Sequence, residues 1–255
     1  MEKINQFSLQ RFLLLMKRHS LMNAKTWLIG LGGISGVLIV VSLIQAYTAG
    51  SFNVEALSKF GIMLIFFGGL LITSMAYNEI HTPAKSQFYL ILPATTSEKL
   101  FSHWLLTSIV YIIVAYAILS LVLGIASLLS ALFFGAQMEF FNPFANENFM
   151  EMARYVVIHS VFFLGALYFR KNNLLKTLLT LFVVIMALSL FGSFVAWLVI
   201  GSGDFGGNLS QDDLNPSTFR FLTETLPLLA RIAFWGLMAP FFLLVSYFKL
   251  KEREV

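Results

Sequence analysis

His159 is the only ionisable side chain near the middle of the long apolar segments of this sequence. A histidine at that depth could relay protons, because proton- and ion-coupled carriers keep Asp, Glu, His or Arg near the membrane midplane. A hydrogen bond to a neighbouring helix is the simpler explanation for a single histidine. Arg231 and Glu224 flank Pro227 at one end of the last apolar segment, where long side chains reach back to the interface. The sequence therefore disfavours a proton pump or a secondary transporter.

The sequence motifs of several enzyme classes are missing from this chain. Its 255 residues include no cysteine, which excludes disulfides and thiolate chemistry. It contains no Gly-x-x-x-x-Gly-Lys-Ser/Thr phosphate loop, no His-Glu-x-x-His and no Gly-x-Ser-x-Gly motif. We therefore expect no catalytic residue, metal site or cofactor in the chain itself. Without a phosphate loop, the chain does not bind ATP in that way.

Residues 78–103 form a partly polar segment between two apolar ones, and this segment is longer than a simple connection needs. Its middle is aromatic and aliphatic. Pro93 lacks a backbone N–H and so ends whatever helix precedes it. Ser97 then starts the next helix, with Thr95 or Thr96 as alternative N-caps. The pattern predicts a docking helix and a turn at the membrane face.

The composition places the chain among membrane proteins. Hydrophobic residues make up 58% of it and charged residues 12%, with a mean hydropathy of +0.81, whereas a soluble domain is about half apolar and a quarter charged. A spanning helix needs about 20 residues. Of the six apolar segments in the sequence, the third is long enough to tilt or to project beyond the membrane, and the fourth is short for one crossing. We predict an all-α integral membrane protein with six transmembrane helices, at residues 27–47, 57–77, 104–134, 155–169, 177–200 and 228–248.

The basic residues predict the orientation of these spans. If both termini are cytoplasmic, 13 of the 17 Lys and Arg residues lie on the inner side. The outer four are Lys59, Arg154, Arg220 and Arg231. Short cytoplasmic loops carry the excess of Lys and Arg in membrane proteins, so the net charge of +4 reflects topology rather than nucleic-acid binding. Residues 78–103 are then a cytoplasmic loop and residues 201–227 an extracytoplasmic one.

Residues 1–26 combine a narrow polar face with a broad apolar one when they are drawn as a helix. The polar face consists of Lys3, Gln6, Gln10 and Lys17. This pattern is typical of an amphipathic helix that lies in the headgroup region. A simple basic anchor before the first span is the alternative, and nothing in this stretch resembles a cleaved signal peptide.

Two further patterns leave alternatives open. Residues 217–226 are expected to form a short helix that Pro227 ends, or else the whole of 201–227 is a plain exposed loop. The Gly-x-x-x-Gly pair of Gly32 and Gly36 permits close approach of another helix. That helix belongs either to this chain or to a second one.

The amphipathic N-terminus, the six spans, the cytoplasmic ends and the long inner loop together resemble the permease subunit of a type-2 ABC exporter (the ABC-2 family). The stretch 86–99 reads Ser-Gln-Phe-Tyr-Leu-Ile-Leu-Pro-Ala-Thr-Thr-Ser-Glu-Lys and is similar to the family's Leu-Pro-small-Ser/Thr…Lys run before the third span. Glu79 stands where relatives often keep an acidic residue. The motif covers only residues 79–99, whereas the architecture covers nearly the whole chain.

This resemblance implies a function and a set of contacts. In the family, the inner loop carries a coupling helix that seats in a groove of the ATP-binding subunit. The residues that would couple to the ATPase are Glu79, Ser86, Phe88, Tyr89, Leu90, Leu92 and Pro93. The implied partners are an ABC ATPase, a second permease as a homo- or heterodimer, and the lipid bilayer, with no nucleic acid.

The resemblance also implies a location, the bacterial cytoplasmic (inner) membrane. Two alternatives to the resemblance remain open. The first is that the inner loop is an ordinary connection whose Leu-Pro merely ends a helix. The second is that the whole chain is a non-transporting anchoring or assembly subunit of a larger complex, which needs no segment for docking an ATPase.

Overall fold

The computed structural model describes residues 6–200 and 220–254, and every regular element in these two ranges is helical. The elements, with η marking a π-helical turn, are α1 (Leu9–Ala49), α2 (Val54–Met75), α3 (Asn78–His81), α4 (Pro83–Ile91), α5 (Thr96–Leu105), η1 (Leu106–Val110), α6 (Tyr111–Phe134), α7 (Asn146–Tyr168), α8 (Asn173–Ile200), η2 (Phe221–Thr225), α10 (Leu226–Ile232), η3 (Ala233–Met238) and α11 (Ala239–Lys251).

Six stretches of helix are long and apolar enough to cross a membrane. They confirm the predicted all-helical architecture with six apolar helices, and they are those of a multi-pass membrane protein. The fourth of them, α7, is longer than the sequence predicts. It has 23 residues and begins at Asn146 instead of Tyr155, so it is long enough for one crossing.

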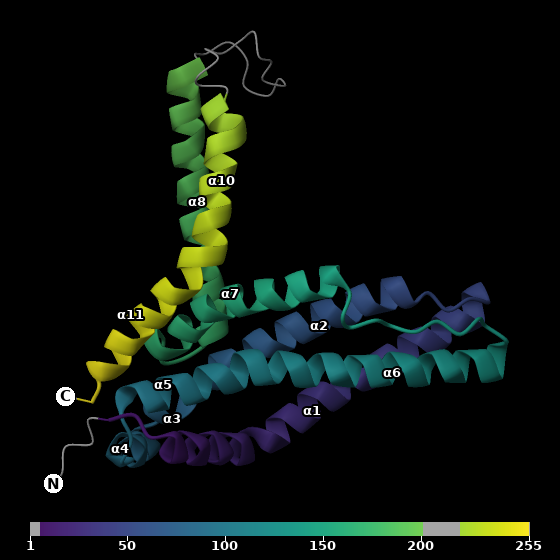
Figure 1. Ribbon diagram of the computed structural model, residues 1–255, viewed down its shortest axis with the longest axis horizontal. Helices are drawn as coiled ribbons and strands as arrows, with labels where there is room; N and C mark the ends of the chain where they lie inside the picture. Colours follow the sequence, from purple (N-terminus) through teal and green to yellow (C-terminus); the bar gives the residue numbers. More distant parts are fainter. Residues whose placement is uncertain (1–5, 201–219, 255) are drawn as a thin grey trace.

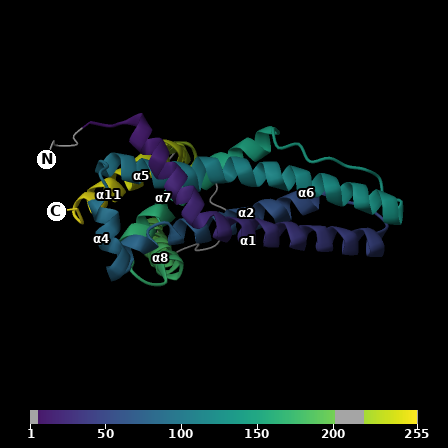
Figure 2. The same ribbon diagram turned by 90° about the horizontal axis from the view of Figure 1, so that it is seen from below.

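α1 is one unbroken helix, so the predicted N-terminal helix 1–26 and the predicted first span 27–47 are joined without a turn. Its 41 residues extend about 60 Å, roughly twice the thickness of a hydrocarbon core. Part of α1 therefore lies beyond what one crossing needs. Figure 2 shows the N-terminal end (purple) running obliquely past α5, while the rest of α1 follows α6.

The core lies between α1, α2, α6 and α7, which run alongside one another in Figure 1. These four helices contribute the buried side chains of Leu38, Ile65, Leu119 and Phe162. In a membrane, helices associate through close packing and hydrogen bonds, because lipid tails are as apolar as leucine. Shape complementarity therefore decides which helices pair.

α8 and residues 221–238 leave this core and point away from it in Figure 1. The most apolar stretch of each of the last two candidate spans buries none of its residues within the described chain. α11 bends back and packs against α7 and α5. The described part of the chain therefore leaves the apolar surface of α8 and α10 uncovered.

Two prolines lie inside the last helical rod. Pro227 lies in the first turn of α10, directly after η2, and Pro240 follows η3 in the same way. The prediction that Pro227 ends a helix is therefore wrong. Proline has no N–H to donate, and its ring clashes with the carbonyl four residues back. A π turn before the proline is wider, so it relieves the clash and leaves room for a turn without that hydrogen bond. Residues 201–219 of the predicted outer loop lie outside the described residues.

The Gly32 and Gly36 face of α1 is open within the described part of the chain, because a Cβ added at either glycine would meet no atom within 4 Å. Close approaches occur at glycines that the sequence pattern does not single out. Gly69 of α2 lies against Tyr155, and Gly165 of α7 lies against Thr177. The structure thus excludes the alternative in which the α1 motif packs against another described helix of this chain.

The two described ends of the chain lie at one end of the molecule, together with α3, α4 and the start of α5 (Figure 1). The segment 78–103, predicted to be a loop with a docking helix, is mostly helical. Residues 136–145, which connect α6 to α7, lie at the opposite end. The two described ends thus lie on the same side of the bundle of α1, α2, α6 and α7, whereas α8 and α10 point across the direction of that bundle.

Candidate functional site

α4 is the predicted docking helix, and local chemistry sets both of its ends. Pro83 occupies its first turn, where the missing N–H costs nothing. The helix ends at Ile91, and Leu92 has extended backbone angles (φ −53°, ψ 125°). A residue that precedes proline is driven out of the α region, so Pro93 stops the helix as predicted.

The apolar side chains of α4 point in two directions. Phe88 and Ile91 are 74% and 77% exposed, whereas Tyr89 is only 1% exposed. Phe88 and Ile91 are one helical turn apart and therefore share the outer face. Sequence reasoning missed Ile91, although the same spacing of three residues was available as a signal.

The remaining predicted coupling residues do not share this outer face. Ser86, Leu90 and Leu92 are half-buried, and Ser86 and Leu90 line a cavity on the inner side of α4. Pro93 is exposed beyond the end of the helix, and Glu79 belongs to α3. Among the predicted apolar residues, Phe88 is therefore the one that lies exposed on the outer face of α4.

Tyr89 attaches α4 to the rest of the molecule through contacts between tilted aromatic rings. Its ring centroid lies 6.5 Å from that of His19 in α1 and 6.0 Å from that of His103 in α5. The ring centroids of His19 and His103 are 3.7 Å apart with their planes tilted by 31°, and the ring of Tyr77 lies 4.6 Å from that of His103. Burial, followed by the charges of Glu254 and Glu79, raises the pKa of Tyr89, so this phenol remains neutral. Tyr89 thus holds α4 on α1 and α5 instead of facing outward.

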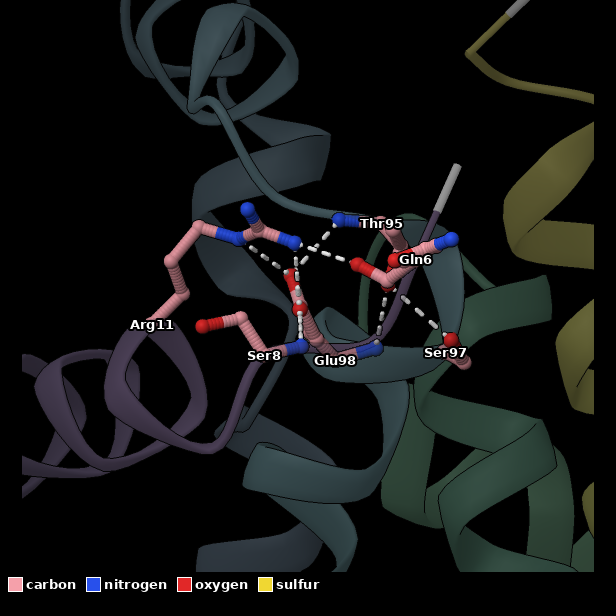
Figure 3. Close-up of polar contacts among 6 residues, drawn as sticks. All are labelled: Gln6, Ser8, Arg11, Thr95, Ser97 and Glu98. Atoms are coloured by element: carbon pink, nitrogen blue, oxygen red, sulfur yellow. Dashed lines mark hydrogen bonds and ion pairs between the residues drawn. The ribbon is translucent and has the colours of Figure 1, made fainter. Parts of the chain in front are cut away.

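Glu98 fixes the N-terminal end of α1 on α5, as Figure 3 shows. Its buried carboxylate accepts hydrogen bonds from the backbone N–H of Ser8 (2.6 Å), from the guanidinium of Arg11 (2.9 and 3.2 Å) and from the backbone N–H of Thr95 (2.9 Å). Thr95 Oγ1 in turn accepts from the N–H of Glu98 at 3.2 Å. This reciprocal capping box identifies Thr95, and not Thr96, as the N-cap of α5.

Two further ion pairs connect the same region. Glu79 of α3 accepts from Arg18 of α1 at 3.0 Å. The ammonium of Lys99, which is buried, donates to Glu254 at 2.9 Å and to the carbonyl of Leu90 at 3.3 Å. The C-terminal residues and the end of α4 are therefore bound to α5.

His81 connects α3 to the end of α7 and to the C-terminal residues. Its Nε2 lies 2.7 Å from the carbonyl of Ala166, and Arg253 donates to its Nδ1 at 3.3 Å and to the carbonyl of Leu167 at 2.9 Å. This arrangement requires the neutral ring with its proton on Nε2. Burial, and then the charges of Arg253 and Arg170, lower the pKa of His81, while the bond to Ala166 opposes the shift.

His159 lies away from this region, inside the membrane-spanning part. Its Nε2 is 2.9 Å from the hydroxyl of Thr107 in η1, and its side chain is fully buried. The simpler of the two explanations, a histidine hydrogen-bonded to a neighbouring helix, is confirmed. Among the described residues, no group of three or more His, Asp or Glu side chains has the arrangement of a metal site.

The structure therefore assembles one connected region at the end that holds both described termini. α4 presents two apolar side chains outward, while its other side contacts α1 and α5 through Tyr89 and packs against α3. The carbonyl of Leu90, at the end of α4, accepts from Lys99 of α5. Such a region can bind an apolar pocket and pass a displacement to several long helices at once. Comparisons with protein-family models, with curated proteins and with solved structures found no match to this chain.

Proposed function

We propose that this chain is the permease subunit of an ATP-driven ABC exporter, which couples to a separate ATPase subunit through residues 78–103. The observation that carries the proposal is the two-sided character of α4. Phe88 and Ile91 project outward without a described partner, while Tyr89 is held between α1 and α5. The resemblance of 86–99 to the ABC-2 run supports the same assignment.

In this mechanism, ATP closes the dimer of ATPase subunits, and the closure displaces α4. Close-packed interiors do not deform continuously, so a displaced α4 moves the elements attached to it as bodies. The ion pair of Glu79 with Arg18 carries the motion to α1, and the hydrogen bond from Lys99 to the carbonyl of Leu90 carries it to α5. Hydrolysis takes place on the partner, because the sequence has no phosphate loop.

The permease acts as a homo- or heterodimer in a bacterial cytoplasmic membrane, with both termini in the cytoplasm. The excess of Lys and Arg on the inner side supports this orientation. A substrate pathway between two permeases also fits the uncovered apolar surface of α8 and α10.

The proposal is tested by co-purification with an ATPase subunit encoded beside this chain. Truncating a buried interface anchor costs about 2 kcal/mol or more, so Phe88→Ala with Ile91→Ala is expected to weaken binding at least about a hundredfold. Phe140→Ala with Phe144→Ala is the matched control. These two phenylalanines are 72% and 76% exposed, at the opposite end of the molecule.

The expected result is loss of the ATPase from the α4 double variant and its retention by the control. Both variants should be inserted and folded to the same extent, because all four side chains lie at the surface. Equal retention by both variants would contradict the coupling role of α4. It would favour the alternative of a non-transporting anchoring or assembly subunit.

A further inference from the structure

A cavity of about 350 Å³ lies on the inner side of α4, and its polar lining is basic. Its walls come from α3, α4, the connection after α7 and the C-terminal residues. The lining residues are Ile80, His81, Pro83, Ser86, Leu90, Arg170 and Arg253. No carboxylate lines it, and the two guanidinium groups remain charged at any physiological pH. Among the described residues that line it, the cavity therefore holds two positive charges and no negative one.

The nearby acidic side chains are already bound elsewhere. Glu79 pairs with Arg18, Glu252 with Lys249, and Glu254 with Lys99. Arg170 forms no ion pair or hydrogen bond with any described residue, and its charge acts unfavourably on Arg253. Like charges in a common cavity repel, and an anion between them would remove that repulsion.

We propose that this cavity binds the phosphate group of an anionic phospholipid headgroup. Arg170 and Arg253 supply the charge, and their planar forks suit the bidentate geometry of phosphate oxygens. The hydroxyl of Ser86 supplies a further donor, which at present donates only locally to the carbonyl of Pro83. Ile80, Pro83 and Leu90 form apolar walls beside the phosphate position.

A lipid fits this cavity better than a free anion because of its place in the fold. The cavity adjoins Leu167 and Arg170 at the end of α7, one of the six candidate spans, on the side that the charge distribution predicts to be cytoplasmic. Basic pockets at the ends of spans on this side are suited to anionic headgroups. Its volume accommodates a phosphate with an attached glycerol.

This inference does not depend on the proposed transport function, and its test contains no ATPase. The full chain is purified in a neutral detergent, and retained lipid is measured by native mass spectrometry with phosphatidylglycerol or phosphatidylcholine as the probe. Removing one charged hydrogen-bond partner is expected to weaken phosphatidylglycerol binding about tenfold. Arg170→Gln should show this loss, and Arg170→Gln with Arg253→Gln a larger one.

Lys17→Gln with Lys25→Gln is the matched control, since it removes two exposed charges on the same predicted side but outside the cavity. The single variant Arg170→Gln is included because replacing Arg253 could disturb folding. Arg170 is exposed and has no described hydrogen-bond or ion-pair partner, so its replacement should leave the fold intact. Phosphatidylglycerol is expected to bind the natural chain and the lysine variant more tightly than phosphatidylcholine does.

Three outcomes would overturn the inference. Equal retention of phosphatidylglycerol by the natural chain and the arginine variants would remove the cavity as the site. An equal loss in the lysine variant would assign binding to the general charge of the inner surface. Protection of the fold by inorganic phosphate alone, with no added effect of phosphatidylglycerol, would assign the cavity to a free anion instead of a lipid.

Discussion

Tyr155 of α7 lies so close to Gly69 of α2 that a Cβ on Gly69 would overlap its hydroxyl group. The same Cβ would lie 2.6 Å from Cε1 of Tyr111. Tyr155 cannot swing away freely, because its hydroxyl donates to the carbonyl of Thr107 at 3.0 Å. The contact between α2 and α7 therefore depends on the absence of a side chain at position 69.

Gly69→Ala is expected to destabilise the protein, because overpacking a filled core usually costs about 1–3 kcal/mol. The higher helix propensity of alanine offsets part of this cost. Gly33→Ala in α1 is the control, because nothing lies within 4 Å of the position of its Cβ. The midpoint of thermal unfolding in detergent should fall for the first variant and stay or rise for the second. Equal destabilisation by both would contradict the packing of α2 on α7.

Glu98→Ala is expected to release the N-terminal end of α1 from α5. The substitution leaves Arg11 and two backbone N–H groups without their acceptor and removes half of the capping box of α5. Breaking a buried ion pair costs about 3–5 kcal/mol. Because Arg11 is 33% exposed and water can solvate it, we expect the free energy of unfolding to fall by about 2–3 kcal/mol, as measured by thermal unfolding.

Glu55→Ala is the control for this prediction, since Glu55 and Lys59 form a single exposed ion pair within one helix. Exposed pairs contribute little, so the free energy of unfolding should stay nearly unchanged. Faster proteolysis within the first residues of α1 in Glu98→Ala, but not in Glu55→Ala, would give a second measurement. Identical stability of the two variants would contradict the anchoring role of Glu98.

His81 predicts a dependence of stability on pH. Its pKa is lowered in the folded state by burial and by Arg253 and Arg170, so below about pH 6.5 the unfolded chain binds more protons than the folded one. The free energy of unfolding should therefore fall as pH drops from 7.5 to 5.5. The ring is only half-buried, which keeps this contribution well below the one-proton limit of about 1.4 kcal/mol per pH unit.

His81→Gln isolates this contribution from that of the other histidines. Glutamine can still donate to the carbonyl of Ala166 but does not titrate. The fall in unfolding free energy between pH 7.5 and 5.5 should be smaller in the variant than in the natural chain. The same pH dependence in both proteins would show that His81 is not held neutral by its surroundings.

The orientation of the spans is tested by labelling single cysteines in this cysteine-free chain. Asn146→Cys, at the start of α7, should react with a membrane-impermeant thiol reagent added outside. Lys85→Cys and Lys171→Cys should react only after the membrane is permeabilised, because the charge distribution places them inside. All three side chains are exposed, so burial cannot mask the reaction. Labelling of Lys85→Cys from outside would overturn the orientation and the coupling mechanism together.

Some features of this protein could be predicted from the sequence because they depend on local physics. Six apolar helices follow from hydropathy over windows of about 20 residues. The end of α4 before Pro93 follows from a backbone rule that acts over a few residues. The start of α5 is less well determined, because the sequence pattern favours Ser97 and leaves Thr95 and Thr96 as alternative caps, whereas the helix begins at Thr96 with Thr95 as its cap. Predictions failed where a neighbouring turn changed the local rule, as with the π turn that lets the helix continue through Pro227.

The sequence by itself therefore determined the membrane class, the number of apolar helices and the position of the short helix that ends before Pro93. Only the tertiary structure decided which residues meet. Glu98 and Arg11 are 87 positions apart, and Lys99 and Glu254 are 155 positions apart, so no local pattern links them. Tyr89 turned out to be buried and Ile91 exposed because α4 packs one face on α1 and α5. The partner of each side chain depends on how whole helices pack, and shape complementarity along their full length fixes that packing.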